Sequence, residues 1–242
     1  MKKLLAATAF LTGIPIRTPG AHDPASLRAA SGFFPVVGLI IGFFLAGIYF
    51  LSSLLFSPVI SALLVLGGQA CITLCLHLDG FAGVAEALGG KKTRDEALRS
   101  MNTHHIGVFG ITALFILLAI KTAALEALAG GAIYAILIIA PAISRWSMLG
   151  PIWKYPHAEG TGPHKILAIS GGEYFIATVF ILALSFIVSP SISLYALIIS
   201  GAAAFCAGKC ITLRVGGVTK DTYGFLVELT ELVFLLSWIA LR

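Results

Sequence analysis

The chain has 242 residues, of which 58% are hydrophobic and only 11% are charged, and its mean hydropathy is +0.99. In soluble domains about a quarter of residues are charged, so this composition excludes an ordinary soluble protein. It predicts an all-α polytopic membrane protein. The net charge of +5 comes from cations scattered singly or in pairs, without the basic stripe of a nucleic-acid-binding surface. We therefore predict no nucleic-acid partner and assign the cations to membrane orientation.

The first 32 residues combine a cationic start with an apolar run that is too short to cross a bilayer. The start resembles a signal peptide, but Gly13 and Pro15 break the run and no small-residue cleavage site follows. We predict that 1–32 is a retained amphipathic or re-entrant segment.

A transmembrane helix needs about twenty mostly apolar residues, and about seven such segments follow in chain order. They are 33–55, 59–78, 107–128, 133–150, 174–188, 192–213 and 223–241. The intervening 79–106 and 151–172 are predicted as loops, and 1–242 as one integral membrane domain.

Lysine and arginine occur at alternate connections between these segments. The connections near Pro58, Gly130 and Pro190 carry neither residue. With the N-terminus inside, the positive-inside rule places the cationic loops in the cytoplasm. Because the candidate chemical groups share that side, the pattern favours an enzyme at one interface over a transporter.

The stretch from His77 to Glu86 brings ionisable residues to the end of the second apolar segment. Such residues are rarely placed at a bilayer edge without a use, so we interpret it as the lip of an active site. If the helix continues, Asp79, Gly83 and Glu86 share one face. Acids two turns apart stand about 10 Å apart along the axis, which suits Mg²⁺ ions bridged by a diphosphate. The alternative is that these acids only mark the end of a membrane helix.

A second motif, Gly216-Gly217-Val218-Thr219-Lys220-Asp221, leads into the last apolar segment. The glycine pair lets backbone N–H groups approach an anion, and Thr219 and Lys220 add a hydroxyl and a cation. The helix that follows offers its positive N-terminal end. We therefore predict an anion site here.

Asp221, Glu228 and Glu231 lie roughly on one face of this last helix. The two glutamates fall inside the membrane region, where an unpaired carboxylate costs a few kcal/mol or more. They need partners such as a metal, a lysine or Arg145. Near the end of the fourth segment, Arg145 either extends to the interface or holds a phosphate by two hydrogen bonds.

Two loops on the same side carry further polar groups. In 101–110, His104 and His105 are adjacent, and neighbouring residues of a helix do not face each other, so a shared metal is not expected. Hydrogen bonding to substrate phosphate or ribose is one interpretation, and a solvated loop is the other. The second loop contains Glu159-Gly160-Thr161-Gly162 and Lys165, and its glycines are typical of a segment that can cover a ligand.

In this order the motifs resemble the adenosylcobinamide-GDP ribazoletransferase (cobalamin synthase) family, and Phe10 to Pro15 is also similar. The resemblance covers nearly the whole chain. It implies an integral enzyme of the cell (inner) membrane with Mg²⁺ as cofactor and its active site facing the cytoplasm. The implied reaction joins adenosylcobinamide-GDP to α-ribazole, or its 5′-phosphate, and releases GMP. The implied partners are these two small molecules and the lipid bilayer, and a homo-oligomer is left open.

The chain also departs from the family pattern at two acidic positions. An aspartate is usual where this chain has Gly83, and the loop that usually reads Met-Lys-Asp-Ser is Met101-Asn102-Thr103-His104 here. Either the site holds its metal with fewer protein oxygens, or the chain is a weakened member. The alternative functions are another membrane phosphotransferase, such as a CDP-alcohol phosphotransferase, and a substrate-binding scaffold.

The predicted site residues fall into three groups. The catalytic residues are His77, Asp79 and Asp221. The metal ligands are Asp79, Glu86, Asp221 and Glu228. The substrate-binding residues are His105, Arg145, Lys165, Gly216, Gly217, Thr219 and Lys220.

Overall fold

The computed structural model describes residues 1–16, 23–102, 106–158, 167 and 169–242. Within these ranges the chain is helical, and its one β-type contact is an isolated bridge between His157 and Val218. The helices are α1 (Lys2–Leu11), α2 (Pro24–Ala30), the short 3-10 helix η1 (Ser31–Phe33), α3 (Phe34–Ser53), α4 (Pro58–Ile72), α5 (Leu76–Leu88), α6 (Arg94–Asn102), α7 (Val108–Ala127), α8 (Ile133–Ser147), α9 (Leu149–Lys154), α10 (Gly171–Val188), α11 (Ile192–Val215) and α12 (Lys220–Leu241).

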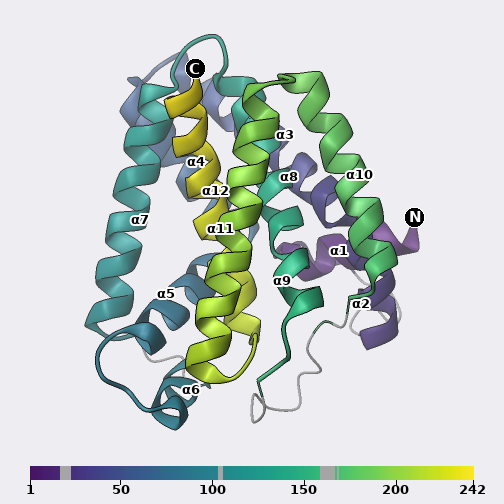
Figure 1. Ribbon diagram of the computed structural model, residues 1–242. Helices are drawn as coiled ribbons and strands as arrows, with labels where there is room; N and C mark the ends of the chain where they lie inside the picture. Colours follow the sequence, from purple (N-terminus) through teal and green to yellow (C-terminus); the bar gives the residue numbers. More distant parts are fainter. Residues whose placement is uncertain (17–22, 103–105, 159–166, 168) are drawn as a thin grey trace.

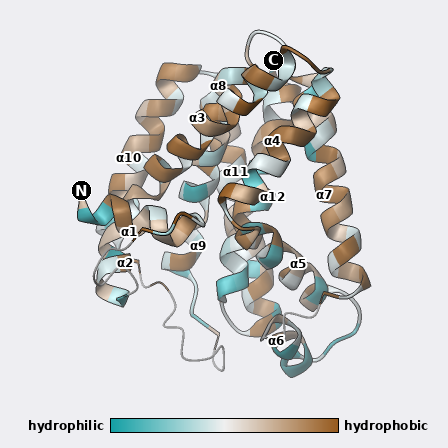
Figure 2. Cartoon of the chain, turned by 180° about the vertical axis from the view of Figure 1, so that it is seen from behind, coloured by the Kyte–Doolittle hydropathy of each residue, from teal (hydrophilic) through white to brown (hydrophobic). Residues whose placement is uncertain are grey.

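Six helical segments of the described chain are long and apolar enough to cross a membrane, and the bent pair α4–α5 makes a seventh if it counts as one span. Large apolar side chains stand exposed on their outer faces, among them Phe43 of α3, Phe115 of α7 and Phe186 of α10. Figure 2 shows the hydrophobic colouring along these outer helices. An apolar surface of this extent fits contact with lipid, and the prediction of an all-α polytopic membrane protein is confirmed.

The two ends of the bundle differ in polarity. The connections from α5 to α6 and from α11 to α12 lie at one end, and the α7–α8 and α10–α11 connections lie at the other (Figure 1). Hydrophilic colouring gathers around α6 at the first end (Figure 2). Lys91 and Lys92 between α5 and α6, and Arg214 and Lys220 on either side of the α11–α12 connection, therefore lie at the same end of the molecule.

At the centre of the bundle are α8 and α12. From Ile139 to Ser147 every residue of α8 is buried, and α12 packs against α5, α7, α8 and α11. Because α12 begins at the polar end and runs back through the core, it connects the polar loops to the buried interior.

The second predicted segment, 59–78, is not one straight helix. Its first part, α4, ends at Ile72, and α5 begins at Leu76 after a turn of 93°. Leu74 and Cys75 adopt left-handed backbone angles, with φ of 49° and 57°, a conformation that ordinary L-residues take at a cost of about 1–2 kcal/mol. A helix does run past Asp79, from Leu76 to Leu88, but it is not a straight continuation of the second segment: His77 and Asp79 lie in the first turn of a separate helix, α5.

The N-terminal segment supports this corner. With ten residues α1 is too short to span a bilayer, and it lies across the long helices (Figure 1). The Gly13 backbone N–H donates to the Ile72 carbonyl at the end of α4, with an N–O distance of 2.8 Å. This bond satisfies one of the carbonyls left free where α4 ends.

Candidate active site

The candidate site is built where α5 packs against the start of α12. Glycines make the approach close: a Cβ atom on Gly80 would lie 2.7 Å from the Asp221 carbonyl oxygen and 3.0 Å from the Gly224 Cα. A Cβ atom on Gly224 would lie 2.8 Å from the His77 carbonyl oxygen. Only residues without side chains let two helix backbones come this near.

One flank of this contact holds two carboxylates. Asp79 and Gly83 are four residues apart and share a face of α5. The Asp221 side chain lies against that face, because a Cβ atom on Gly83 would be 2.9 Å from Asp221 Oδ2. Two predicted catalytic residues, Asp79 and Asp221, are thus brought to the same flank from positions far apart in the sequence.

The first turn of α12 adds a positive end. Thr219 is the N-cap and its side chain accepts a hydrogen bond from the Thr222 backbone N–H, while the Thr222 hydroxyl accepts one from the Thr219 N–H. The Thr219 hydroxyl therefore caps the N-terminal end of α12. The remaining first-turn N–H groups and Lys220 supply the positive charge that favours an anion at a helix N-terminus.

The glycine pair before this helix is packed against other parts of the chain. Gly216 ends α11 with a φ of 87°, and a Cβ atom there would lie 2.2 Å from an Arg94 guanidinium nitrogen. Gly217 packs against the His157–Ala158 backbone, with 2.4 Å between its would-be Cβ and the Ala158 nitrogen. Close packing accounts for both glycines, and their substrate-binding function stays a prediction.

His157 belongs to the same packed turn. The Val218 N–H donates to the Pro156 carbonyl and the Ala158 N–H donates to the Val218 carbonyl, which holds this segment beside the start of α12. Partial burial lowers the pKa of the His157 imidazole below its ordinary value. The imidazole is therefore neutral at pH 7.

Glu86 joins three elements. Its Oε1 accepts a hydrogen bond from Lys92 Nζ at 2.7 Å, and its Oε2 accepts one from the Gly110 backbone N–H at 3.1 Å. This carboxylate ties the end of α5 to the loop before α6 and to the start of α7. Both oxygens have protein partners, so a metal at Glu86 would compete with these bonds.

Glu228 and Glu231 form a buried ion network with a residue that the sequence interpretation missed. Lys121 of α7, only 1% exposed, lies 2.6 Å from Glu228 Oε2 and 2.8 Å from Glu231 Oε1. Gln69 of α4 donates to both oxygens of Glu231. The sequence signal for this network is a lysine in the middle of an apolar segment, because such a residue needs a buried partner of opposite charge.

Arg145 is the second cation of this network. Its side chain is fully buried, and its Nη1 donates to Glu231 Oε2 at 3.1 Å and to the Ser144 hydroxyl at 3.0 Å. One lysine and one arginine thus form ion pairs with two glutamates inside the bundle. The structure brings neither Arg145 nor Glu228 to the Asp79–Asp221 flank: seven residues of α12, about 10 Å of helix, separate Glu228 from Asp221.

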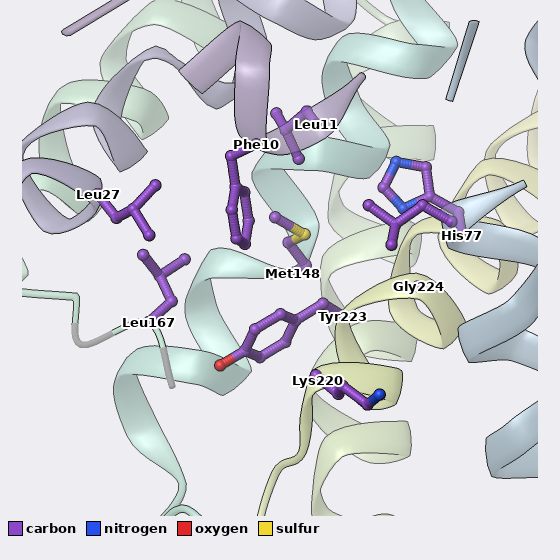
Figure 3. Close-up of a pocket in the computed structure, with 10 residues that line it drawn as sticks. Phe10, Leu11, Leu27, His77, Met148, Leu167, Lys220, Tyr223 and Gly224 are labelled. Atoms are coloured by element: carbon purple, nitrogen blue, oxygen red, sulfur yellow. The ribbon is translucent and has the colours of Figure 1, made fainter. Parts of the chain in front are cut away.

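His77 lies on the opposite flank of the α5–α12 contact. Residues two apart in a helix point in nearly opposite directions, so His77 faces away from Asp79, and Tyr223 likewise faces away from Asp221. Figure 3 shows both rings lining a cavity together with Phe10 of α1. The catalytic assignment of His77 stays a prediction, and its position places it beside this cavity. The predicted substrate residues His105 and Lys165 lie outside the described residues.

The carboxylate flank fits a magnesium ion. No group of three or more histidine, cysteine, aspartate or glutamate side chains is gathered for a metal within the described ranges. Mg²⁺ is usually held by one or two carboxylates and completes its octahedron with water and substrate phosphate oxygens. Asp79 and Asp221, beside the positive start of α12, satisfy that pattern without Glu86 or Glu228.

Comparisons with known proteins point to one family. A sequence model described as cobalamin-5-phosphate synthase matches residues 3–239. A protein of Brevibacillus brevis is 31% identical over 98% of this chain and 99% of its own length. One from Pseudomonas syringae is 33% identical over 96% of each chain. A third, from Syntrophobacter fumaroxidans, is 32% identical over 95% of this chain and 94% of its own.

All three relatives are named adenosylcobinamide-GDP ribazoletransferase. No solved structure was found to match the chain. The family model and the relatives cover the helices that carry the site as well as the outer spans. The chain belongs to the cobalamin-5-phosphate synthase family.

Proposed function

We propose that this chain is a membrane-embedded adenosylcobinamide-GDP ribazoletransferase. The observation that supports this most directly is the pairing of Asp79 and Asp221 beside the N-terminal end of α12, in a chain that matches its family over nearly its full length. Two carboxylates next to a positive helix end suit a substrate that carries a diphosphate.

The reaction is a phosphoryl substitution. A ribose hydroxyl oxygen of α-ribazole, or of its 5′-phosphate, forms a bond to the phosphorus nearer the cobinamide. The bond from that phosphorus to the oxygen bridging the two phosphates breaks, and GMP leaves with this oxygen. The hydroxyl proton passes to a carboxylate oxygen of Asp79 or Asp221, or to water.

The protein contributes mainly position and charge, as in other phosphoryl transfers. The first-turn N–H groups of α12 and the Lys220 ammonium face the negative charge of the diphosphate. Asp79 and Asp221 would hold Mg²⁺, which supplies further charge neutralisation on the phosphates and on the leaving GMP. The neighbouring Thr219–Thr222 cap fixes the helix end that carries these groups.

We also infer that the site faces the cytoplasm across the cell (inner) membrane. The support is the gathering of the cationic connections at the end of the bundle where α12 begins, together with the tendency of lysine and arginine to stay on the cytoplasmic side.

The test is a reconstitution with purified protein in lipid nanodiscs. Adenosylcobinamide-GDP and α-ribazole are supplied with Mg²⁺, and the corrinoid product and GMP are quantified by chromatography. We expect one GMP per product formed, and loss of both when EDTA replaces Mg²⁺. Turnover of a CDP-lipid with none of adenosylcobinamide-GDP would show a different phosphotransferase. Substrate binding without turnover at saturating Mg²⁺ would show a scaffold.

A further inference from the structure

A small cavity borders the buried ion network where α4, α5, α7 and α12 meet. Its volume is about 10 Å³, close to the space that one buried water molecule needs. The helices α4 and α7 stand side by side around it (Figure 1). The apolar part of its lining includes Leu66, Leu78 and Leu118, and the polar part is Gln69, Thr73, Lys121 and Glu228.

On one side of the cavity, Lys121 has one N–H more than its partners accept. A lysine ammonium group carries three N–H bonds. Two of them are donated to Glu228 Oε2 at 2.6 Å and to Glu231 Oε1 at 2.8 Å. No third acceptor lies within hydrogen-bond distance in the part of the chain that the structure describes. The third N–H therefore needs an acceptor inside the bundle.

The other polar side chains of the lining supply unpaired acceptors. Lys121 bonds to Oε2 of Glu228, and Oε1 has no donor among the described residues. Gln69 donates its Nε2 to Glu231, which leaves its Oε1 in the same state. Glu228 is 3% and Gln69 5% exposed, so each keeps a small surface that a water-sized group can reach. The Thr73 hydroxyl donates to the Gln69 carbonyl at 2.8 Å and can still accept.

Charge and size favour a water molecule over other occupants. Lys121 and Arg145 already balance the two glutamates, so an ion would add an uncompensated charge to the interior. The volume excludes an organic ligand. A lipid chain end would leave the polar atoms unpaired. Water can accept one hydrogen bond from Lys121 and donate two, which is within the two to four that buried waters make.

We propose that this cavity binds one structural water molecule, which accepts a hydrogen bond from Lys121 Nζ and donates one to Glu228 Oε1 and one to a side-chain oxygen of α4. The water ties α4 to α7 and α12. Glu228 is the glutamate of the network that is nearer to Asp221 along α12, so this water holds the part of α12 that leads to the candidate site. The assignment does not depend on the proposed reaction.

The direct test is a crystal structure of the full-length protein grown in a lipid phase, at a resolution that shows ordered water. We expect one spherical density within about 3 Å of both Lys121 Nζ and Glu228 Oε1. Elongated density that continues to the bilayer would show a lipid chain. That result, or a cavity without density in a map that shows other buried waters, would overturn the inference.

Ala70, which lines the cavity from α4, allows an independent test in nanodiscs. Ala70→Ser adds a hydroxyl about as large as a water, and this group can take over the hydrogen bonds. Ala70→Cys adds a similar volume with a much weaker hydrogen-bonding group. We expect the Ser variant to unfold at the wild-type temperature and the Cys variant to unfold a few degrees lower.

The matched control is Cys71→Ser, which makes the same exchange of thiol and hydroxyl at the next, exposed position of α4. It is expected to leave the unfolding temperature unchanged. Equal unfolding temperatures of the Ala70→Ser and Ala70→Cys proteins, or a lower temperature for Ala70→Ser, would show that the cavity does not hold water.

Discussion

Lys121 shows how a single residue holds the interior together. It neutralises two carboxylates of α12 from the middle of α7, and Arg145 balances the remaining charge from α8. Removing one member of a buried ion network leaves an uncompensated charge, whereas removing a matched pair does not. The network therefore fixes α12 against its neighbours only while its charges balance.

Replacing Lys121 with methionine is expected to destabilise the fold. The two buried glutamates would retain only Arg145 as a cation, so we predict a loss of about 3–5 kcal/mol in the free energy of unfolding. Unfolding in detergent can be followed by intrinsic tryptophan fluorescence. The matched control is the double variant Lys121→Met/Glu228→Gln, which restores charge balance and should recover most of the loss. Equal instability of the single and double variants would contradict the pairing.

The sequence alone predicts Asp79 and Asp221 as site residues, but it does not tell which other acids lie beside them. Helical periodicity correctly places Glu228 and Glu231 near one face, and their need for partners is met by Lys121 and Arg145. Periodicity does not tell which helix supplies a partner, so it does not single out Lys121 in its apolar segment. Glu86 keeps its predicted face on α5, but its contacts with Lys92 and the Gly110 backbone depend on the tertiary fold.

At the scale of helices, the site depends on how closely α5 approaches α12. The spans were predictable because about twenty apolar residues are a strong signal. The 93° turn between α4 and α5 was not, because it falls in the apolar run Cys71 to Leu76, which has neither glycine nor proline to mark it. That turn brings the first turn of α5, which carries His77 and Asp79, against the start of α12.

Gly80→Ala tests the close approach. The new methyl group would lie 2.7 Å from the Asp221 carbonyl oxygen, and a backbone atom cannot move aside cheaply. We expect a destabilisation of about 1–3 kcal/mol and at least a tenfold loss of turnover, measured by thermal unfolding and by GMP release. Gly67→Ala in α4 is the control, because its Cβ would meet nothing within 4 Å. A fully active and stable Gly80→Ala protein would rule out this packing.

At the scale of the whole molecule, the cationic connections share one end of the bundle and define a predicted orientation. We expect Lys91→Cys, between α5 and α6, to react with a membrane-impermeant maleimide only after cells are permeabilised. Gly131→Cys, in the α7–α8 connection, should react in intact cells. Both positions are exposed, and the four native cysteines are first replaced by alanine. The reverse labelling pattern would place the site on the outer side of the membrane.

The central claim is that Asp79 and Asp221 together form the reaction centre of a transferase. Its most direct test is GMP release from adenosylcobinamide-GDP and α-ribazole by Asp79→Asn and Asp221→Asn proteins, which keep side-chain size and lose the charge. Each is expected to lower kcat about 10²–10⁴-fold with unchanged thermal unfolding, while Asp95→Asn, at an exposed position of α6, stays at the wild-type rate. Near-wild-type turnover in either variant at the α5–α12 contact would contradict the account.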